Sequence, residues 1–275
     1  MPKKIWTRVR EGALEALSPT RCASCERPGA LVCDECLERM VRIDPVFSCL
    51  RCGAPFGSLV CTECNEARLG QDRPAAPEGA AYRPAAPEGT AQNVPPPAPA
   101  LLAAIDRTLA VAAFEGPPSR IVRAYKDGGE RRLAPLIADL LLEAARRAEE
   151  AAPERYGGLL SGAEGIVFVP ATAAAYRRRG FDHMEGVARA LCAASGVPLA
   201  DALAKRGQGD QRALGRQGRI AAAARLYEVV LPVEGRSLLL IDDVLTTGAT
   251  VGAAAAALKA RGAAHVDVLA FARVW

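Results

Sequence analysis

Eight of the nine cysteines lie from position 22 to position 64 and form four Cys-x-x-Cys pairs. A gap of two residues lets a tight turn direct both sulfur atoms towards one point, so two pairs supply the four thiolates of a tetrahedral zinc site. The cysteines therefore predict two structural zinc sites in which the protein fills every coordination position. The predicted ligands are Cys22, Cys25, Cys33, Cys36, Cys49, Cys52, Cys61 and Cys64.

Two other interpretations of these cysteines are weaker. A disulfide framework needs an oxidising compartment. The lysines at positions 3 and 4 are followed by charged residues at positions 8, 10 and 11 in place of the apolar core of a secretory signal. A thioredoxin-like redox motif does not explain four copies in so short a segment. We therefore expect zinc-bound thiolates in a cytoplasmic protein.

Two pairings of the cysteine pairs remain open. Consecutive pairs would close short loops at 26–32 and 53–60, whereas an interleaved arrangement would join the first pair with the third. We favour consecutive pairing, with Cys49-Leu50-Arg51-Cys52-Gly53 resembling a zinc knuckle. Because the segment has few large apolar side chains, we expect it to need metal in order to fold.

The chain of 275 residues has room for one full domain and a smaller one. No apolar run approaches the ~18 residues of a membrane span, so no membrane insertion is expected. The net charge of +4 does not by itself indicate nucleic-acid binding. An aromatic content of 5% argues against an extensive platform for stacking bases.

Residues 70–100 differ in composition from the segments on either side. They contain eight prolines and two copies of the string Arg-Pro-Ala-Ala-Pro-Glu-Gly, at 73–79 and 83–89. Proline fixes φ and removes a backbone donor, so neither helix nor sheet is expected. We predict a cysteine-rich module at 1–69, a flexible tether at 70–100 and a larger domain at 101–275.

The larger domain alternates predicted strands and helices. Apolar runs predict strands at 109–114, 165–170, 237–241 and 265–274. Helical spacing predicts a helix capped by Ser119 that stops at Gly128, a second with Pro135 near its start, and further helices at 185–194 and 251–261. This alternation predicts an α/β fold with a parallel sheet covered on both faces.

The strand at 237–241 is followed by two adjacent carboxylates and a Thr/Gly loop. Ligands of open parallel sheets bind beyond the carboxyl ends of the strands. The carboxylates of Asp242 and Asp243 suit a ribose diol, and the loop with its helix N-terminus suits a phosphate. A sugar 5-phosphate has both ends, whereas an Asp-Asp turn with threonine caps is the alternative. The predicted phosphate-binding residues are Thr246, Thr247, Gly248, Ala249 and Thr250.

This string resembles the signature of the type I phosphoribosyltransferases, which bind phosphoribosyl pyrophosphate. The resemblance implies that Asp242 and Asp243 hold the ribose hydroxyls and that the loop holds the 5-phosphate. With the cysteine pairs, the whole chain is similar to the ComF family, a double zinc ribbon joined to a phosphoribosyltransferase domain. The further motifs are Lys126-Asp127-Gly128-Gly129, Val169-Pro170, Arg177-Arg178-Arg179-Gly180-Phe181, Gln211 and Arg219.

The resemblance implies a transferase, in which Mg²⁺ arrives with phosphoribosyl pyrophosphate and a nitrogenous acceptor displaces the diphosphate. Charge on the diphosphate would be met by Lys126 and by one of Arg177, Arg178 and Arg179. Lys126 could instead be a solvated helix end. His183 is expected to be structural or exposed rather than catalytic.

The chain departs from the family pattern at the walls of the expected pocket. Asp182 and His183 replace an Asn-Gln pair, Ala171 lies in an altered loop after the second strand, and Ala222 replaces an asparagine. These changes bear on acceptor specificity and turnover.

Two classes of function follow. The first is a phosphoribosyltransferase-like enzyme linked to DNA uptake, competence or nucleotide metabolism. The second is a non-catalytic protein of the DNA-uptake machinery that contacts single-stranded DNA or other uptake proteins. The basic segment 205–225 could track a nucleic-acid backbone or close over the diphosphate.

Overall fold

The computed structural model describes residues 20–55, 61, 64, 102–205 and 226–275. The predicted tether at 70–100 lies outside these residues. So do Gln211, Arg219 and Ala222 in the basic segment. The boundaries at 1–69, 70–100 and 101–275 therefore stay predictions.

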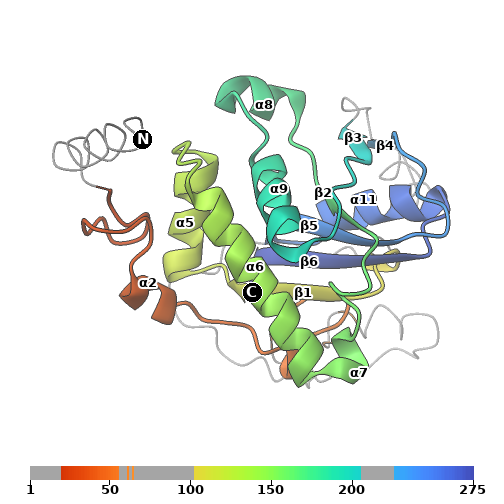
Figure 1. Ribbon diagram of the computed structural model, residues 1–275, viewed down its shortest axis with the longest axis horizontal. Coiled ribbons are helices and arrows are strands. Elements are labelled where there is room, and N and C mark those ends of the chain that lie inside the picture. Colours follow the sequence, from red (N-terminus) through yellow and green to blue (C-terminus); the bar gives the residue numbers. More distant parts are fainter. Residues whose placement is uncertain (1–19, 56–60, 62–63, 65–101, 206–225) are drawn as a thin grey trace, which may run out of the picture.

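A parallel sheet of four strands forms the centre of the larger domain, in the order β1-β6-β5-β2 (Figure 1). Each neighbouring pair is parallel. Nearly all of its residues are buried, which explains why these strands read as continuous apolar runs in the sequence. The predicted α/β fold is thereby confirmed. The strands are β1 (Thr108–Ala113), β2 (Gly165–Phe168), β5 (Ser237–Leu245) and β6 (His265–Arg273).

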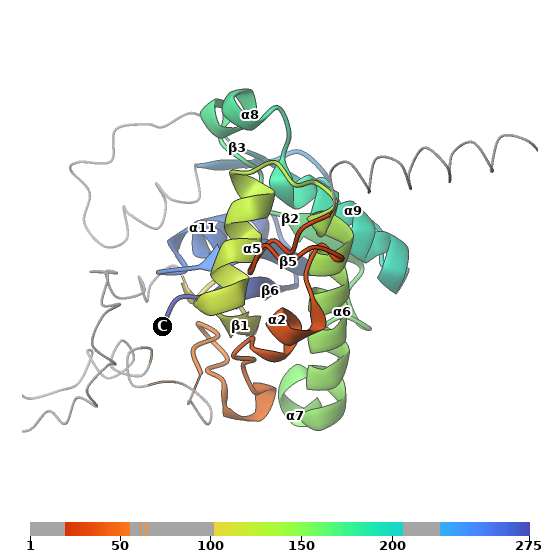
Figure 2. The same ribbon diagram turned by 90° about the vertical axis from the view of Figure 1, so that its left-hand side faces the viewer.

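Helices cover both faces of the sheet. On one face, α5, α6 and α9 bury the side chains of Leu239 and Ile241. On the other face, α11 packs on Leu238 and Leu240, because neighbouring residues of a strand point to opposite faces. Figure 2 shows the sheet between α11 and the pair α6 and α9. The helices are α5 (Gly116–Lys126), α6 (Leu133–Ala151), α7 (Pro153–Tyr156), α8 (Ala173–Arg179), α9 (His183–Ser195) and α11 (Ala249–Ala260).

Several element boundaries differ from the sequence-based expectation. Ser119 does not cap α5, which begins at Gly116; its Oγ donates to the Gly116 carbonyl oxygen at 2.9 Å. The expected strand at 237–241 continues to Leu245, so Asp242 and Asp243 lie within β5. Pairing with β6 extends that far, and the pairing depends on a neighbour that is distant in sequence. The antiparallel hairpin of β3 (Leu203–Lys205) and β4 (Tyr227–Val229) was not expected.

The cysteine-rich module packs along the free edge of β1. The Ile43 N–H donates to the Val111 carbonyl oxygen at 3.0 Å, and the Ala113 N–H donates to the Val41 carbonyl oxygen at 2.9 Å. This antiparallel contact covers an edge that would otherwise present unpaired backbone groups. The module also contains α2 (Asp34–Glu38) and a short 3₁₀ helix, η1 (Pro45–Phe47).

The module crosses the sheet edge, so its two halves lie on opposite faces. Cys22 and Cys36 belong to the apolar cluster of α5, α6 and α9. Cys49 and Cys52 belong to the cluster of α11. Both halves therefore share the core of the larger domain. Among the described residues, no helix is long and apolar enough to cross a membrane.

Candidate functional site

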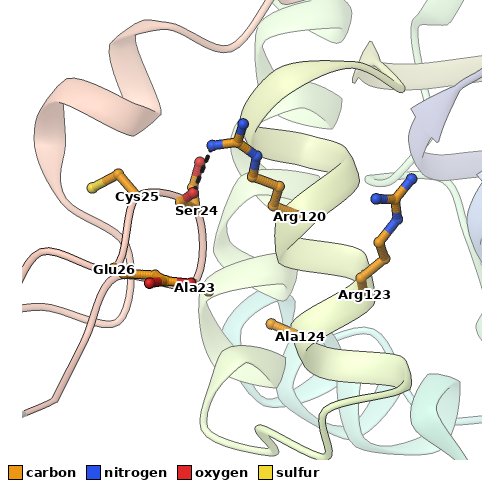
Figure 3. A pocket seen from close by; sticks show the side chains of 7 residues that line it. All are labelled: Ala23, Ser24, Cys25, Glu26, Arg120, Arg123 and Ala124. Atoms are coloured by element: carbon orange, nitrogen blue, oxygen red, sulfur yellow. Dashed lines mark hydrogen bonds between the residues drawn. The ribbon is translucent and has the colours of Figure 1, made fainter.

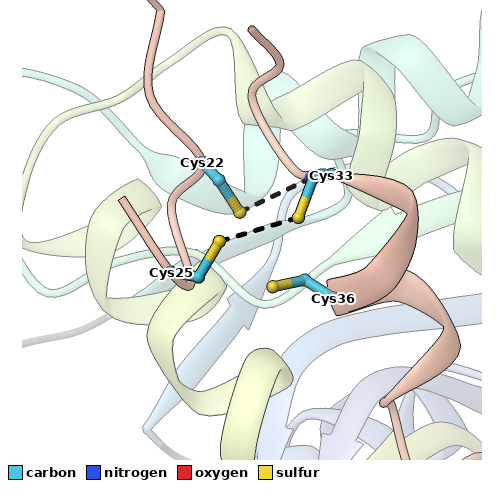
Figure 4. A group of neighbouring side chains, drawn as sticks. All are labelled: Cys22, Cys25, Cys33 and Cys36. Atoms are coloured by element: carbon cyan, nitrogen blue, oxygen red, sulfur yellow. Dashed lines mark hydrogen bonds between the residues drawn. The ribbon is translucent and has the colours of Figure 1, made fainter. Parts of the chain in front are cut away.

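The eight clustered cysteines form two groups of four thiols (Figure 4 shows the first). Cys22, Cys25, Cys33 and Cys36 make one group, and Cys49, Cys52, Cys61 and Cys64 make the other; within each group the sulfur atoms lie within 4.8 Å of one another. The consecutive pairing is thus confirmed, and the interleaved pairing and the disulfide framework are wrong. All nine cysteines are free thiols.

Both groups fit a tetrahedral zinc ion. Zn–S bonds of about 2.3 Å place neighbouring sulfur atoms about 3.8 Å apart, and the Sγ atoms of Cys25 and Cys33 are 3.6 Å apart. Backbone N–H groups of Ser24 and Cys33 donate to Cys22 Sγ, each at 3.4 Å. Burial opposes ionisation of Cys22, but these N–H groups and that of Cys25 outweigh it and lower its pKa to about 6. A thiolate is the form that binds zinc.

The acidic pair lies near the carboxyl end of β5, where both side chains are almost fully buried. The Asp243 N–H donates to Asp242 Oδ1 at 2.9 Å, and the Val244 N–H donates to Asp243 Oδ1 at 2.7 Å. Each carboxylate thus keeps one oxygen on the backbone. The other oxygen of each can meet a ligand or a side chain.

Two donors, from α5 and α9 on the same face of the sheet, contact Asp243 Oδ2. Lys126 Nζ, at the end of α5, lies 2.6 Å from it, and His183 Nε2, at the start of α9, lies 3.0 Å from it. Burial would raise the pKa of Asp243, but the bond from His183 and the charge of Lys126 outweigh it and hold the pKa below its ordinary value. Asp243 is therefore the ionised member of the pair.

Asp242 has the opposite character. Burial, and then the charge of neighbouring Asp243, raise its pKa to about 8. The β3–β4 hairpin brings Lys205 and Tyr227 near it, with Lys205 Nζ 5.4 Å from the centre of the Tyr227 ring. Burial lowers the pKa of Lys205. One carboxylate and one carboxylic acid stand side by side at neutral pH.

The predicted phosphate loop joins β5 to α11. Gly248 is the N-cap of α11 with φ of +72°, so Ala249 and Thr250 belong to the first helical turn rather than to a loop. Thr247 Oγ1 accepts from the Ala249 N–H at 3.3 Å. A helix N-terminus presents backbone N–H groups and a positive dipole end, which suit an anion.

Arg273, the last residue of β6, holds this loop through hydrogen bonds to its backbone. Its buried guanidinium donates through Nη1 to the carbonyl oxygens of Leu245 and Thr246, at 3.2 and 2.5 Å. Its Nε donates to the Cys52 carbonyl oxygen at 2.9 Å. One side chain therefore ties the second cysteine cluster to the predicted phosphate loop.

The three arginines of α8 have different surroundings. Arg177 and Arg178 are exposed in the last turn of the helix. Arg179 is turned inward, with Nη1 3.4 Å from His183 Nδ1 and Nη2 3.7 Å from Asp127 Oδ1. Of the three arginines, Arg179 is therefore the one linked to the acidic pair. The link is indirect, because Arg179 contacts His183 and His183 contacts Asp243.

The structure distinguishes between the alternatives left open for Lys126 and for His183. Lys126 is not a solvated helix end, because its ammonium group contacts Asp243. His183 is buried and lies in α9, where it contacts both Asp243 and Arg179. Asp182, the other residue of the altered pair, caps α9 through the Met184 N–H at 3.0 Å and also accepts from the Ala171 N–H at 2.6 Å. Sequence reasoning missed Lys205 and Tyr227 as site residues. The one sequence signal was that Lys205 begins the basic segment 205–225.

Comparisons with known proteins agree with this architecture. The Phosphoribosyl transferase domain family matches residues 172–274. Over 270 residues the chain is 28% identical to the DNA utilization protein YhgH of Salmonella typhi, covering 93% of this chain and 97% of that protein. It is 28% identical over 152 residues to Competence protein ComFC of Streptococcus pneumoniae, covering 54% and 60%. It is 40% identical over 73 residues to a ribose-phosphate pyrophosphokinase of Granulibacter bethesdensis, covering 26% and 24%.

The parallel sheet and the matched domain define a type I phosphoribosyltransferase fold to which a zinc-ribbon module is joined. The similarity to YhgH extends over both the cysteine-rich module and the matched domain, because it covers 93% of this chain. Together with the two cysteine clusters, these similarities support a ComF-family protein with a phosphoribosyltransferase domain.

Proposed function

We propose that this protein binds phosphoribosyl pyrophosphate at the carboxyl end of β5. The observation that carries the proposal is the buried acidic pair next to the N-terminus of α11. Asp242 and Asp243 would accept the ribose hydroxyls. Thr246, Thr247 and Gly248, with the first N–H groups of α11, would surround the 5-phosphate. Binding needs both the acidic pair and the N-terminus of α11, because carboxylates alone would repel a phosphate.

We further propose a phosphoribosyl transfer. A nitrogenous acceptor forms a bond to C1 of the ribose while the bond from C1 to the diphosphate oxygen breaks. Diphosphate leaves with the electron pair, and the acceptor nitrogen gives its proton to the departing diphosphate or to water. Lys126, which contacts Asp243, would stabilise the leaving charge together with one of the three arginines of α8. Mg²⁺ would accompany the diphosphate, held mainly by ligand oxygens and water.

Calorimetry with phosphoribosyl pyrophosphate and Mg²⁺ tests the binding. We expect one ligand per chain and a loss of at least about tenfold in affinity for Asp243→Asn, because a charge-assisted hydrogen bond contributes about 1.5–3 kcal/mol. Asp201→Asn, at an exposed position, serves as the matched control. Release of diphosphate with nitrogenous acceptors, lost in Asp243→Asn, tests the transfer. No binding by the unsubstituted chain would contradict the proposal.

A second candidate is contact with single-stranded DNA; two relatives are named as a DNA utilization protein and a competence protein. A cavity of about 400 Å³ separates the first cysteine cluster from α5 and is lined by Arg120 and Arg123 (Figure 3). Arg120 is held by the Ser24 carbonyl oxygen at 2.8 Å, so its charge is fixed beside the cleft. Guanidinium groups suit phosphate oxygens.

Fluorescence anisotropy with labelled oligo(dT) tests this second function. We expect binding that weakens with salt, and Arg123→Gln to lower the slope of log affinity against log salt by about 0.7. Asp243→Asn should leave this binding unchanged. Arg189→Gln, which removes an exposed arginine paired with Glu185, is the control. Equal binding by Arg123→Gln and the unsubstituted chain would contradict this location.

A further inference from the structure

His183 is a buried histidine with both ring nitrogens in polar contacts. Nε2 lies 3.0 Å from Asp243 Oδ2, and Nδ1 lies 3.4 Å from Arg179 Nη1. A guanidinium group can only donate, so Nδ1 accepts and the ring proton is on Nε2. Asp182 Oδ1 is 3.8 Å from Nδ1, beyond hydrogen-bond distance, and it accepts from the Met184 N–H instead. The contacts therefore assign the neutral tautomer that donates to Asp243.

The ring is held from several directions. Tyr125 Oη donates to the His183 backbone carbonyl oxygen, and Asp182 caps the helix that His183 begins. The side chain of Arg179 is itself 9% exposed, and among the described residues its Nε finds no hydrogen-bond acceptor. Its fixed contacts are those with His183 and, at 3.7 Å, with Asp127. His183 thus has little freedom to leave Asp243.

The ammonium group of Lys126 has two candidate partners, the carboxylate of Asp243 and the diphosphate of the ligand. In the ligand-free site it lies 2.6 Å from the Asp243 oxygen that His183 also contacts. The proposed transfer requires a cation at the diphosphate, and Lys126 is a described candidate for it. If Lys126 moved to the diphosphate, the buried carboxylate of Asp243 would lose its ion-pair partner, and among the described residues the contact from His183 would remain. A buried carboxylate without donors is strongly unfavourable, so a second donor that stays in place is needed.

We propose that His183 is the positioning residue that holds Asp243 towards the ribose hydroxyls while Lys126 moves from Asp243 to the diphosphate. Arg179 fixes the tautomer that makes this possible. The inference rests on the proposed binding of phosphoribosyl pyrophosphate. It gives the altered residue at position 183 a definite task in this chain.

Two ligands separate the roles of the two donors. Ribose 5-phosphate has the hydroxyls and the 5-phosphate but no diphosphate. Calorimetry on His183→Leu should show both ligands weakened by a similar factor of about ten or more, because one charge-assisted hydrogen bond is lost. His183→Gln keeps an N–H donor and should restore both affinities to within about threefold. Lys126→Ala should weaken phosphoribosyl pyrophosphate more than ribose 5-phosphate.

The tautomer can be read without any ligand. The chain has two histidines, so long-range ¹H–¹⁵N spectra show two rings, and His265→Gln assigns them. We expect His183 as the Nε2–H tautomer, and Arg179→Met to shift the ring away from it. An Nδ1–H tautomer in the unsubstituted chain would overturn the inference, since Nε2 would then have no proton to donate.

The outcomes separate this inference from the proposed function. If the unsubstituted chain binds both ligands and His183→Leu binds them equally well, the positioning role is wrong and the proposed function stands. If His183→Gln fails to restore affinity although it melts at the same temperature as the unsubstituted chain, the donor role is also wrong. If the unsubstituted chain binds neither ligand, the proposed function itself fails.

Discussion

Asp242 and Asp243 are neighbours in β5, but their carboxyl groups meet different surroundings. Alternation along the strand turns Asp243 towards α5 and α9, where Lys126 and His183 meet it. Among the described residues, the donor to Asp242 is the Asp243 backbone N–H, and burial together with the nearby charge of Asp243 raises the pKa of Asp242. The charge of the pair is therefore carried by one residue.

Asp242→Asn tests this division. The folded-state pKa of about 8 lies above the ordinary value of 3.8. The folded chain therefore binds more protons than the unfolded chain between these values, and stability falls as pH rises through that interval. Asparagine removes this loss. Since a pKa unit is about 1.4 kcal/mol and 1 kcal/mol shifts Tm by about 2–4 °C, Asp242→Asn should melt at least about 4 °C above the unsubstituted chain at pH 9.

Scanning calorimetry at pH 5 and pH 9 measures this difference. At pH 5 the melting difference should be smaller than at pH 9, because only the first part of the interval between the two pKa values has been crossed. Asp201→Asn, at an exposed position, should show no such dependence. A melting difference that shrinks as pH rises would contradict the assignment.

The sequence revealed the acidic pair but not its partners. Two adjacent carboxylates after an apolar run are visible in any reading of the chain. Their donors come from far away, with Lys126 separated from Asp243 by 117 positions and His183 by 60. The helix expected at 185–194 begins two residues earlier, at His183, because Asp182 caps α9. Contacts of this kind depend on packing and have no local pattern.

At the scale of elements, apolar runs predicted the four sheet strands well and their ends less well. β5 extends to Leu245 because β6 offers backbone partners up to Arg273. The β3–β4 hairpin was missed, since each of its strands has only three residues. The turn into α11 is a further element-scale feature, because Gly248 has a positive φ and lies against Leu102.

Gly248→Ala should therefore destabilise the β5–α11 turn for two reasons. The left-handed conformation costs a non-glycine residue about 1–2 kcal/mol. In addition, the new Cβ would lie 2.6 Å from Leu102 Cδ2, so this buried side chain must move. Gly196→Ala, at φ of +81° with no atom within 4 Å of its Cβ, has the conformational cost alone. In urea unfolding, Gly248→Ala should be the less stable variant by about 1 kcal/mol or more; equal stability would show that Leu102 yields freely.

At the scale of the whole molecule, the cysteine-rich module is part of the same core as the sheet. Its two clusters lie on opposite faces of the β1 edge, and Arg273 links the second cluster to the loop before α11. The sequence predicted both clusters, because the spacing within each pair is local. It did not predict that they pack on the larger domain, since the tether suggested separate bodies.

This placement predicts different metal release from the two clusters. Cys25 and Cys33 of the first cluster are partly exposed, whereas all four cysteines of the second cluster are buried. A chelator should reach the first site more readily. With a chromogenic chelator we expect two phases of zinc release, each of one ion per chain, with the slow phase accompanied by loss of the folded core.

Cysteine variants assign the phases. Cys25→Ser should lower the metal content to about one zinc per chain and remove the fast phase, because three thiolates hold zinc less tightly than four. Cys192→Ser is the control, since this half-buried thiol in α9 belongs to neither cluster. It should leave the metal content and both phases unchanged. If Cys25→Ser removed the slow phase instead, the more buried cluster would be the more labile one, and burial on the α11 face would not be what protects it.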